Sequence, residues 1–423
     1  MLKNPKRSNR LEGLSNRRRQ GSGGVSRIPN QDYEATPAEI KKTRELARQV
    51  GIHDSVDILS LIPKDLNKKI ESILGPFNET TAIALIREAL QTVKLFRELH
   101  SVFESEAYSP GEKMKHGTQL GESVIASNTE AALSYLGPAS SPFALLATGD
   151  LGRKEMQDFS KLEFGIVGSD EDFDRLKKIR ALTRWKIQLA NKIYSQTFLN
   201  PADIKHGQAP VVSFGSSSSF DAQDSLQSSL LKHSTGDARV FKSFSGTKSL
   251  SADRYAQSVT DIKTSGTNPG KQWKELDLFL KEYRPDFPPF SMKYDLDKSL
   301  YHFLIYSIQK LAQIHLLPST NTLERISHMQ RLSIIPQNTA KDLSEAFLIL
   351  VNYRRICHSY YRSHNSTAFV LLKHGESMPA GNMPVFSGKD ASLLAKICGD
   401  LTKFHKFLKK TLDEYASQTD LPT

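Results

Sequence analysis

The chain has 423 residues, 38% of them hydrophobic, which is enough for two or three folded domains with apolar cores. No window approaches 18 consecutive apolar residues, and residues 1–10 are polar and basic. The sequence therefore predicts no membrane span and no secretory signal, which makes the cytosol the default compartment. The two cysteines, Cys357 and Cys398, offer neither a disulfide framework nor zinc spacing, so we expect two buried thiols.

The formal charge of +11 is concentrated at the N-terminus. Residues 1–30 hold eight basic residues and one acidic residue, Glu12, a net +7 that leaves about +4 for all the others. That remainder is too small to indicate a basic binding face. Residues 1–35 are rich in Gly, Ser and Asn, and we expect a disordered basic tail. Two interpretations stay open for it: a solvated tail without a dedicated ligand, or a contact with RNA, anionic lipid or an acidic partner.

Helical patterns fill residues 36–137, which we predict to be an α-helical N-terminal region. Thr36-Pro37-Ala38-Glu39 joins an N-cap threonine, a proline at the first helical position and a capping-box glutamate, and predicts a helix over 37–50. Further helices are expected at 64–74 and 79–104. A polar break at 108–113 should precede a helix near 119–136, which Gly137-Pro138 ends.

Two short apolar runs, at 143–147 and 162–167, predict buried strands with a glycine-containing loop between them. A helix is expected near 185–194, whereas 200–229 lacks periodicity and predicts a long loop or a weak strand pair. After these, residues 266–423 predict a helical bundle with a proline-rich linker at 285–289. Its helices are expected at 271–280, 294–317, 322–332, 339–361 and 391–415.

The loop between the predicted strands carries the chemistry. Gly149-Asp150-Leu151-Gly152-Arg153-Lys154-Glu155 is followed by Ser160-Lys161-Leu162-Glu163. Nucleotidyl transfer to a hydroxyl needs a backbone cradle for the triphosphate, two divalent ions and carboxylates that fix those ions. Two carboxylates placed two residues apart on a strand point to one face, where they can hold Mg²⁺ against the phosphates.

This order of residues resembles the DNA polymerase β-like nucleotidyltransferase superfamily. Within it, the chain is most similar to bacterial PII-protein uridylyltransferases and to related nucleotidyltransferases with a helical substrate-binding domain. The match rests on a G-x-x-G-R-x-E-x-x-x-x-S run that ends at Ser160, on Asp237-x-Arg239, and on the segments 294–296, 321–326 and 346–355. The resemblance covers roughly residues 80–365 with the motif order preserved.

The resemblance implies an α+β fold with a small mixed-sheet nucleotidyltransferase core at 138–265. It also implies transfer of a nucleoside monophosphate from a nucleoside triphosphate to a protein acceptor, with Mg²⁺ as cofactor. Five residues would bind the nucleotide, namely Gly149, Asp150, Gly152, Arg153 and Ser160. Glu163 and Asp203 would hold metal and act in catalysis, with Asp221 or Asp224 as alternatives to Asp203.

Two departures from the family pattern affect the same step. Lys161 stands where the family carries an aspartate, and Asp150 stands where it carries serine or glycine. An ammonium group cannot coordinate Mg²⁺, and a carboxylate in the cradle repels a triphosphate. Lys161 would then either replace a Mg²⁺ ion at the phosphate, as a catalytic residue, or form an ion pair with Asp150 across an emptied site.

Three function classes therefore remain: an active nucleotidyltransferase, a degraded pseudo-nucleotidyltransferase that serves as a protein-interaction or regulatory module, and an RNA-binding relative that depends on the basic tail. Other side chains are set aside. The histidines at 302, 315, 328 and 358 lack metal spacing. Arg354-Arg355 is interpreted as a solvated or salt-bridged helix face in preference to a phosphate contact.

Overall fold

The computed structural model describes residues 35–54, 56–157, 160–168, 172–198, 239–245, 269–361, 365–372 and 383–419. Outside these ranges lie residues 1–34 of the predicted tail and the whole of 200–229, including Asp203, Asp221 and Asp224. The described elements combine helices with two three-stranded sheets, which confirms the α+β fold class.

Four helices form the N-terminal part of the described chain, and two of them begin with capping boxes. They are α1 (Pro37–Gln49), α2 (Lys64–Leu74), α3 (Glu79–Glu104) and α4 (Pro110–Leu136), with a 3-10 helix, η2 (Ile58–Leu61), between α1 and α2. Thr36 and Glu39 exchange the hydrogen bonds that the sequence predicted. The predicted break lies at residues 105–109 rather than 108–113, and the helix after it starts at Pro110 rather than near 119, because Ser109 and Glu112 form a second capping box.

The central sheet has the order β2-β1-β3, and both of its pairings are antiparallel. Its strands are β1 (Phe143–Ala147), β2 (Phe164–Gly168) and β3 (Arg239–Phe244). Every residue of the middle strand, β1, is buried, as its uninterrupted apolar sequence predicted. A single helical turn, α5 (Gly149–Gly152), follows β1, and a long helix, α6 (Phe173–Phe198), follows β2.

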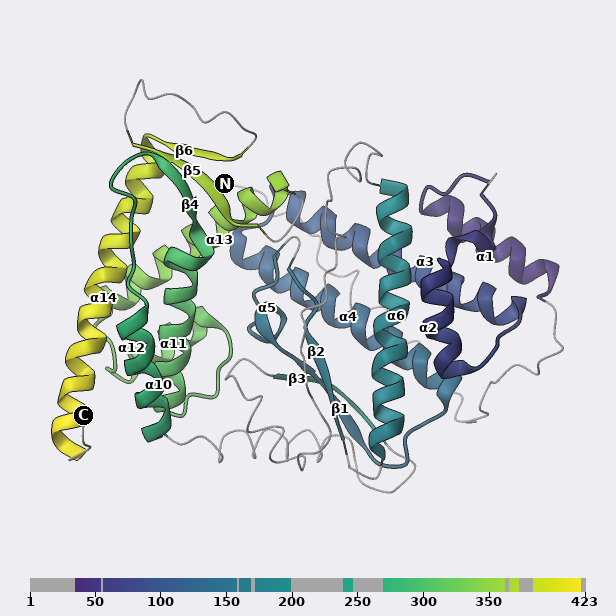
Figure 1. Cartoon of the computed structure of the whole chain (residues 1–423), viewed down its shortest axis with the longest axis horizontal. Helices are drawn as coiled ribbons and strands as arrows, with labels where there is room; N and C mark the ends of the chain where they lie inside the picture. The colour runs from purple at the N-terminus through teal and green to yellow at the C-terminus, as the bar shows by residue number, and fades with distance from the viewer. Residues whose placement is uncertain are drawn as a thin grey trace, which may run out of the picture.

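One hydrophobic core joins the N-terminal helices to this sheet. It includes Leu90 of α3, Val124 of α4, Leu145 of β1 and Ile187 of α6, each with no exposed surface. In Figure 1, α4 and α6 run beside the sheet, and α1 and α2 lie beyond α6. The predicted units 36–137 and 138–265 therefore share a core, with α3 and α4 packed against α6.

The C-terminal part contains five helices and a second sheet. The helices are α10 (Pro269–Glu282), α11 (His302–Ile314), α12 (Thr322–Arg331), α13 (Gln337–Tyr361) and α14 (Lys389–Thr419). The strands β4 (Met292–Asp295), β5 (Thr367–Leu371) and β6 (Val385–Ser387) form a mixed sheet, in which β4 pairs antiparallel and β6 pairs parallel with β5. Figure 1 shows this sheet at one end of the helices.

The helix predicted over 294–317 is wrong at its start, because residues 292–295 are a strand. A π-helical turn, η4 (Asp297–Tyr301), then leads into α11. The strand exists because residues 292–295 pair with residues 367–370, a long-range contact that local periodicity does not register. These elements enclose a second hydrophobic core, to which α4 contributes Met114. Cys357 and Cys398 are both buried in it, as predicted.

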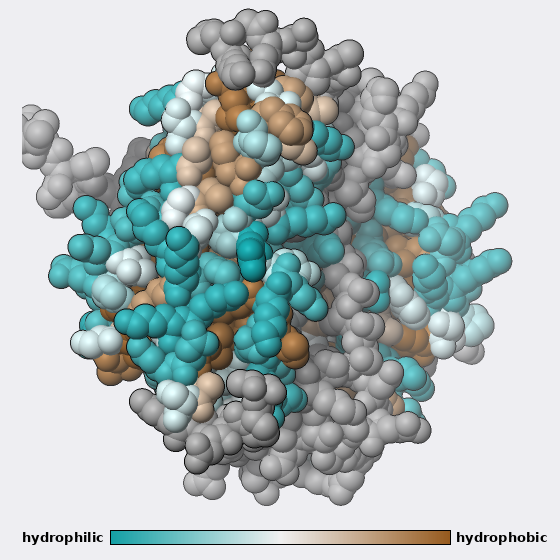
Figure 2. Space-filling model, turned by 60° about the vertical axis from the view of Figure 1, so that its left-hand side comes forward, coloured by the Kyte–Doolittle hydropathy of each residue, from teal (hydrophilic) through white to brown (hydrophobic). Residues whose placement is uncertain are grey.

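The outer face of the C-terminal part is largely hydrophilic, with hydrophobic areas between the polar side chains (Figure 2). Its large exposed hydrophobic side chains include Leu278, Phe290, Leu316 and Leu332. Across the described ranges, we find no helix that combines the length and the apolar character needed to cross a bilayer.

Candidate functional site

The loop predicted to bind nucleotide starts where β1 ends, and its first glycine lies against Glu163. The Thr148 amide donates a hydrogen bond to the Glu163 carbonyl oxygen at 3.0 Å, which continues the pairing of β1 with β2. Gly149 has a φ of +60°, and a Cβ built there would overlap Oε2 of Glu163. Glycine is required at this position for both reasons. The structure therefore brings Gly149 and Glu163 together, as the resemblance implies.

The Asp150 carboxylate lies inside the loop and is held by two other predicted nucleotide-binding residues. Arg153 forms an ion pair with Oδ1 of Asp150. The Ser160 hydroxyl donates to Oδ2 at 2.8 Å, and the Ser160 hydroxyl itself accepts from the Gln157 amide at 3.0 Å. The groups expected to contact phosphate oxygens thus contact a carboxylate of the same chain.

The ion pair that the described residues show for Asp150 is with Arg153 and not with Lys161. Arg153 lies three residues along the same helical turn, so its guanidinium reaches the carboxylate without crossing the loop. Lys161 is half-buried just before β2. The predicted Lys161–Asp150 bridge is replaced by this local pair.

Glu155 connects the loop to the C-terminal helices. Its side chain is fully buried, accepting from Nε of Arg153 at 2.9 Å and from the Thr322 amide at 2.6 Å. Burial raises the pKa of Glu155, and Arg153 and Thr322 oppose that shift. Since Thr322 is the first residue of α12, the carboxylate also lies at the positive end of a helix.

Two further hydrogen bonds join the same pieces of chain. The Thr320 hydroxyl donates to the Gly152 carbonyl oxygen at 2.9 Å, and Nδ2 of Asn321 donates to the Arg153 carbonyl oxygen at 3.0 Å. Asn321 also caps α12 by accepting from the Glu324 amide. The two motif blocks at 149–160 and 321–326 therefore contact each other directly. The sequence predicts the two blocks in different domains, and no local signal in it indicates this long-range contact.

Arg239 supports the opposite side of the loop. It lies on β3 opposite Ala147, forms an ion pair with Glu122 of α4, and points towards the carbonyl oxygens of Leu151 and Gly152 at 3.4 Å. Its motif partner Asp237 lies outside the described residues. The role that the structure gives Arg239 is to hold the backbone of α5.

The described residues do not fit a two-Mg²⁺ centre. Of the predicted metal ligands, Glu163 is described and Asp203 is not. Lys161 presents an ammonium group, which cannot coordinate a cation, and Asp150 is bound to Arg153 and Ser160. Within the described ranges, no group of three His, Cys, Asp or Glu side chains is arranged to hold a metal ion.

The position of the loop, its internal ion pair and its contact with α12 can be compared with known proteins. No protein-family model matches this chain, and no curated protein does. The nucleotidyltransferase interpretation therefore rests on the residues of the loop and their contacts.

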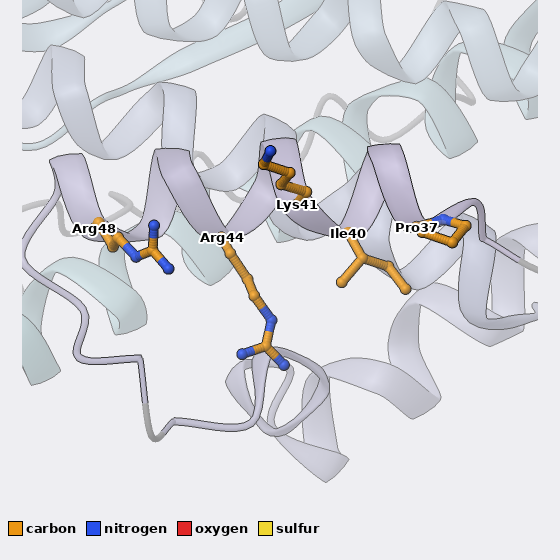
Figure 3. Close-up of a pocket in the computed structure, with 5 residues that line it drawn as sticks. All are labelled: Pro37, Ile40, Lys41, Arg44 and Arg48. Atoms are coloured by element: carbon orange, nitrogen blue, oxygen red, sulfur yellow. The ribbon is translucent and has the colours of Figure 1, made fainter.

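A second surface feature, a groove of about 330 Å³, lies along α1 and away from the loop. Its lining consists of Pro37, Ile40, Lys41, Arg44 and Arg48, and Figure 3 shows Ile40 and Arg44 extending from the same side of the helix. Arg48 is already paired with Asp54 at 2.5 Å. No predicted nucleotide-binding residue lines this groove, so it is separate from the candidate site.

Proposed function

We propose that this protein is a nucleotidyltransferase-like scaffold that has lost catalysis and serves as a protein-interaction or regulatory module. The observation that carries the proposal is the Asp150 carboxylate, which is bound by both Arg153 and Ser160. These are the two side chains that the resemblance assigns to phosphate binding. The loop keeps the motif glycines, but its two anion-binding side chains bind the Asp150 carboxylate of the same loop.

The occupied loop opposes nucleotide binding in two ways. A triphosphate would have to displace a carboxylate that is largely buried, since the Asp150 side chain is 12% exposed. It would also meet the negative charge of Asp150, and two charges of one sign repel strongly at close range away from bulk water. Binding of a triphosphate therefore costs the free energy of the Asp150–Arg153 ion pair, and the repulsion between Asp150 and the phosphates adds to that cost.

The metal position weakens catalysis independently of the loop. Two divalent ions supply most of the charge stabilisation in phosphoryl and nucleotidyl transfer. With Lys161 at the first ligand position, Glu163 is the one carboxylate of the predicted metal site that the described residues contain, and a single carboxylate of the acidic pair holds two ions poorly. Even a nucleotide that entered the loop would lack the charge needed to stabilise its transition state.

The first test is direct. Purified full-length protein is incubated with each of the four radiolabelled nucleoside triphosphates and Mg²⁺, with a cell extract as the source of protein acceptors. We expect no label on the protein or on any acceptor, and no rise in melting temperature with nucleotide that depends on Mg²⁺. Magnesium-dependent labelling by the wild-type chain would contradict the proposal and support the active uridylyltransferase-like alternative.

The second test restores the family residues in the variant Lys161→Asp combined with Asp150→Ser. We expect this variant to bind nucleoside triphosphate in a Mg²⁺-dependent manner, with stabilisation of about 2.7 kcal/mol at a ligand concentration one hundred times Kd. The matched control is Lys154→Asp with Asp150→Ser, because Lys154 is exposed in the same loop and the change in net charge is the same. The control should show no Mg²⁺ dependence. Identical behaviour of the two variants would show that Lys161 does not silence the site.

A further inference from the structure

A buried arginine and a buried tyrosine lie side by side where the loop meets the C-terminal helices. Arg354 of α13 stacks on Tyr301 at the end of η4, with Cζ of the arginine 3.7 Å from the ring centroid. Arg354 is 2% exposed and Tyr301 is 5% exposed. Such stacking fixes the plane of the guanidinium group and therefore the direction in which its N–H groups point.

Both side chains have donors without acceptors. Arg354 bonds Asp297 through Nε, and the other oxygen of Asp297 accepts from the Ser366 hydroxyl at 2.6 Å. Nη1 of Arg354 and the Tyr301 hydroxyl have no hydrogen-bond partner among the described residues. Buried polar atoms without partners are rare in folded proteins, and a bound anion or an ordered water supplies the missing acceptor.

Charged groups of the candidate loop lie near these two side chains. The carboxylates of Asp150 and Glu155 and the guanidinium of Arg153 all act electrostatically on the Tyr301 hydroxyl, and burial raises its pKa. Asp150 likewise acts on Arg354. Gln157, in the same loop and 2% exposed, has neither amide atom bonded to a described residue. Partnerless polar atoms therefore occur both in the loop and in the helices that pack against it.

We propose that Arg354 and Tyr301 form a binding position for a small oxyanion, a free phosphate or the phosphate group of a larger ligand. Both missing partners are hydrogen-bond acceptors. A phosphate oxygen accepts several hydrogen bonds without having to donate any, so one phosphate group can accept from both Nη1 of Arg354 and the Tyr301 hydroxyl. The position is distinct from the loop cradle, because Arg153 and Ser160 do not contribute to it. The inference holds whether or not the loop binds nucleotide.

The test uses the full chain and inorganic phosphate as the probe. Binding is measured by isothermal titration calorimetry at constant ionic strength, with chloride as the reference anion. The variant Tyr301→Phe removes the hydroxyl and keeps the ring against Arg354, and we expect phosphate binding to weaken on the order of tenfold. The matched control is Tyr353→Phe, which removes a hydroxyl that donates to Asp390 at 2.8 Å, away from the loop. The control should bind phosphate within about twofold of the wild type.

Two results would overturn the inference. One is the absence of saturable phosphate binding by the wild-type chain, which would mean that water satisfies the buried donors. The other is an equal loss of binding in Tyr301→Phe and Tyr353→Phe, which would show that the hydroxyl effect is not specific to this position. A parallel titration with a nucleoside triphosphate in EDTA distinguishes the source of the anion. Tighter binding of the triphosphate assigns the position to a nucleotide, and equal binding assigns it to free phosphate.

Discussion

At the scale of single residues, Glu155 links the two halves of the described structure. It is fully buried, and its partners Arg153 and Thr322 come from the loop and from the first turn of α12. Removing a buried carboxylate that binds a charged side chain and a helix N-terminus costs much stability. The positive groups that it leaves behind are then buried without an opposite charge or a hydrogen-bond acceptor. The glutamate of the motif therefore has a structural role that does not depend on catalysis.

We predict that Glu155→Ala lowers the free energy of unfolding by about 3–5 kcal/mol, because Arg153 loses a buried partner and the Thr322 amide loses its acceptor. Urea denaturation followed by circular dichroism measures the change. The control is Glu130→Ala, which removes an exposed carboxylate 3.5 Å from Lys242 and should cost less than about 1 kcal/mol. Equal losses in the two variants would contradict the linking role of Glu155.

At the scale of elements, local chemistry decided where the N-terminal helices start. The residues Thr36 to Glu39 and Ser109 to Glu112 follow one pattern, with an N-cap hydroxyl, proline at the first helical position and glutamate at the third. The second instance was predicted as a break because Pro110-Gly111 stands inside a polar run. The capping signal prevails there, since proline at the first helical position removes no intrahelical hydrogen bond.

We predict that Ser109→Ala destabilises the protein by about 1 kcal/mol, because the amide of Glu112 loses the hydroxyl that accepts its hydrogen bond. Thermal denaturation measures the effect. Ser123→Ala is the matched control on the same helix, because that serine is exposed and bonds only the Gln119 carbonyl oxygen among the described residues. If both variants lose the same stability, the cap does not set the start of α4.

At the scale of the whole molecule, two hydrophobic cores meet through polar contacts. The second core depends on α14, whose His405 is buried and bonds the Leu280 carbonyl oxygen of α10 at 3.0 Å. The carbonyl can only accept, so Nε2 carries the proton. Burial lowers the pKa of His405 below its usual 6.5, and the nearby Lys409 and Arg284 lower it further.

The pKa of His405 is lower in the folded chain than in the unfolded chain. As the pH drops through about 6.5, the unfolded chain therefore takes up a proton on this histidine while the folded chain does not. We therefore predict that the contribution of His405 to the free energy of unfolding is complete above that pH and is lost as the pH drops towards the pKa of the folded state. The loss is about 1.4 kcal/mol for each pH unit by which folding lowers the pKa. His405→Gln, which keeps a donor for Leu280, should flatten the pH dependence of urea unfolding between about pH 7.5 and 5.5. A slope in His405→Gln equal to that of the wild type would contradict the prediction.

The sequence by itself determined most helices and the central strand of the first sheet, because their signals are local. Apolar spacing and caps placed α2, α3 and β1 within their observed bounds. Sequence also identified the loop at Gly149, whereas the contact of that glycine with Glu163 comes from the structure. It did not find β4 to β6, because these strands exist only through pairing with residues distant in the chain.

Only the tertiary structure decided which partner each charged side chain takes. The sequence leaves open whether Lys161 pairs with Asp150, and in the structure the partner of Asp150 is Arg153, within one helical turn. The sequence predicts a solvated or salt-bridged position for Arg354, and the structure shows it salt-bridged to Asp297 but buried, as is the loop residue Glu155. The physical reason is that the strength of an ion pair depends on the distance between the two charges and on their burial. Burial is set only when residues far apart in the chain pack together.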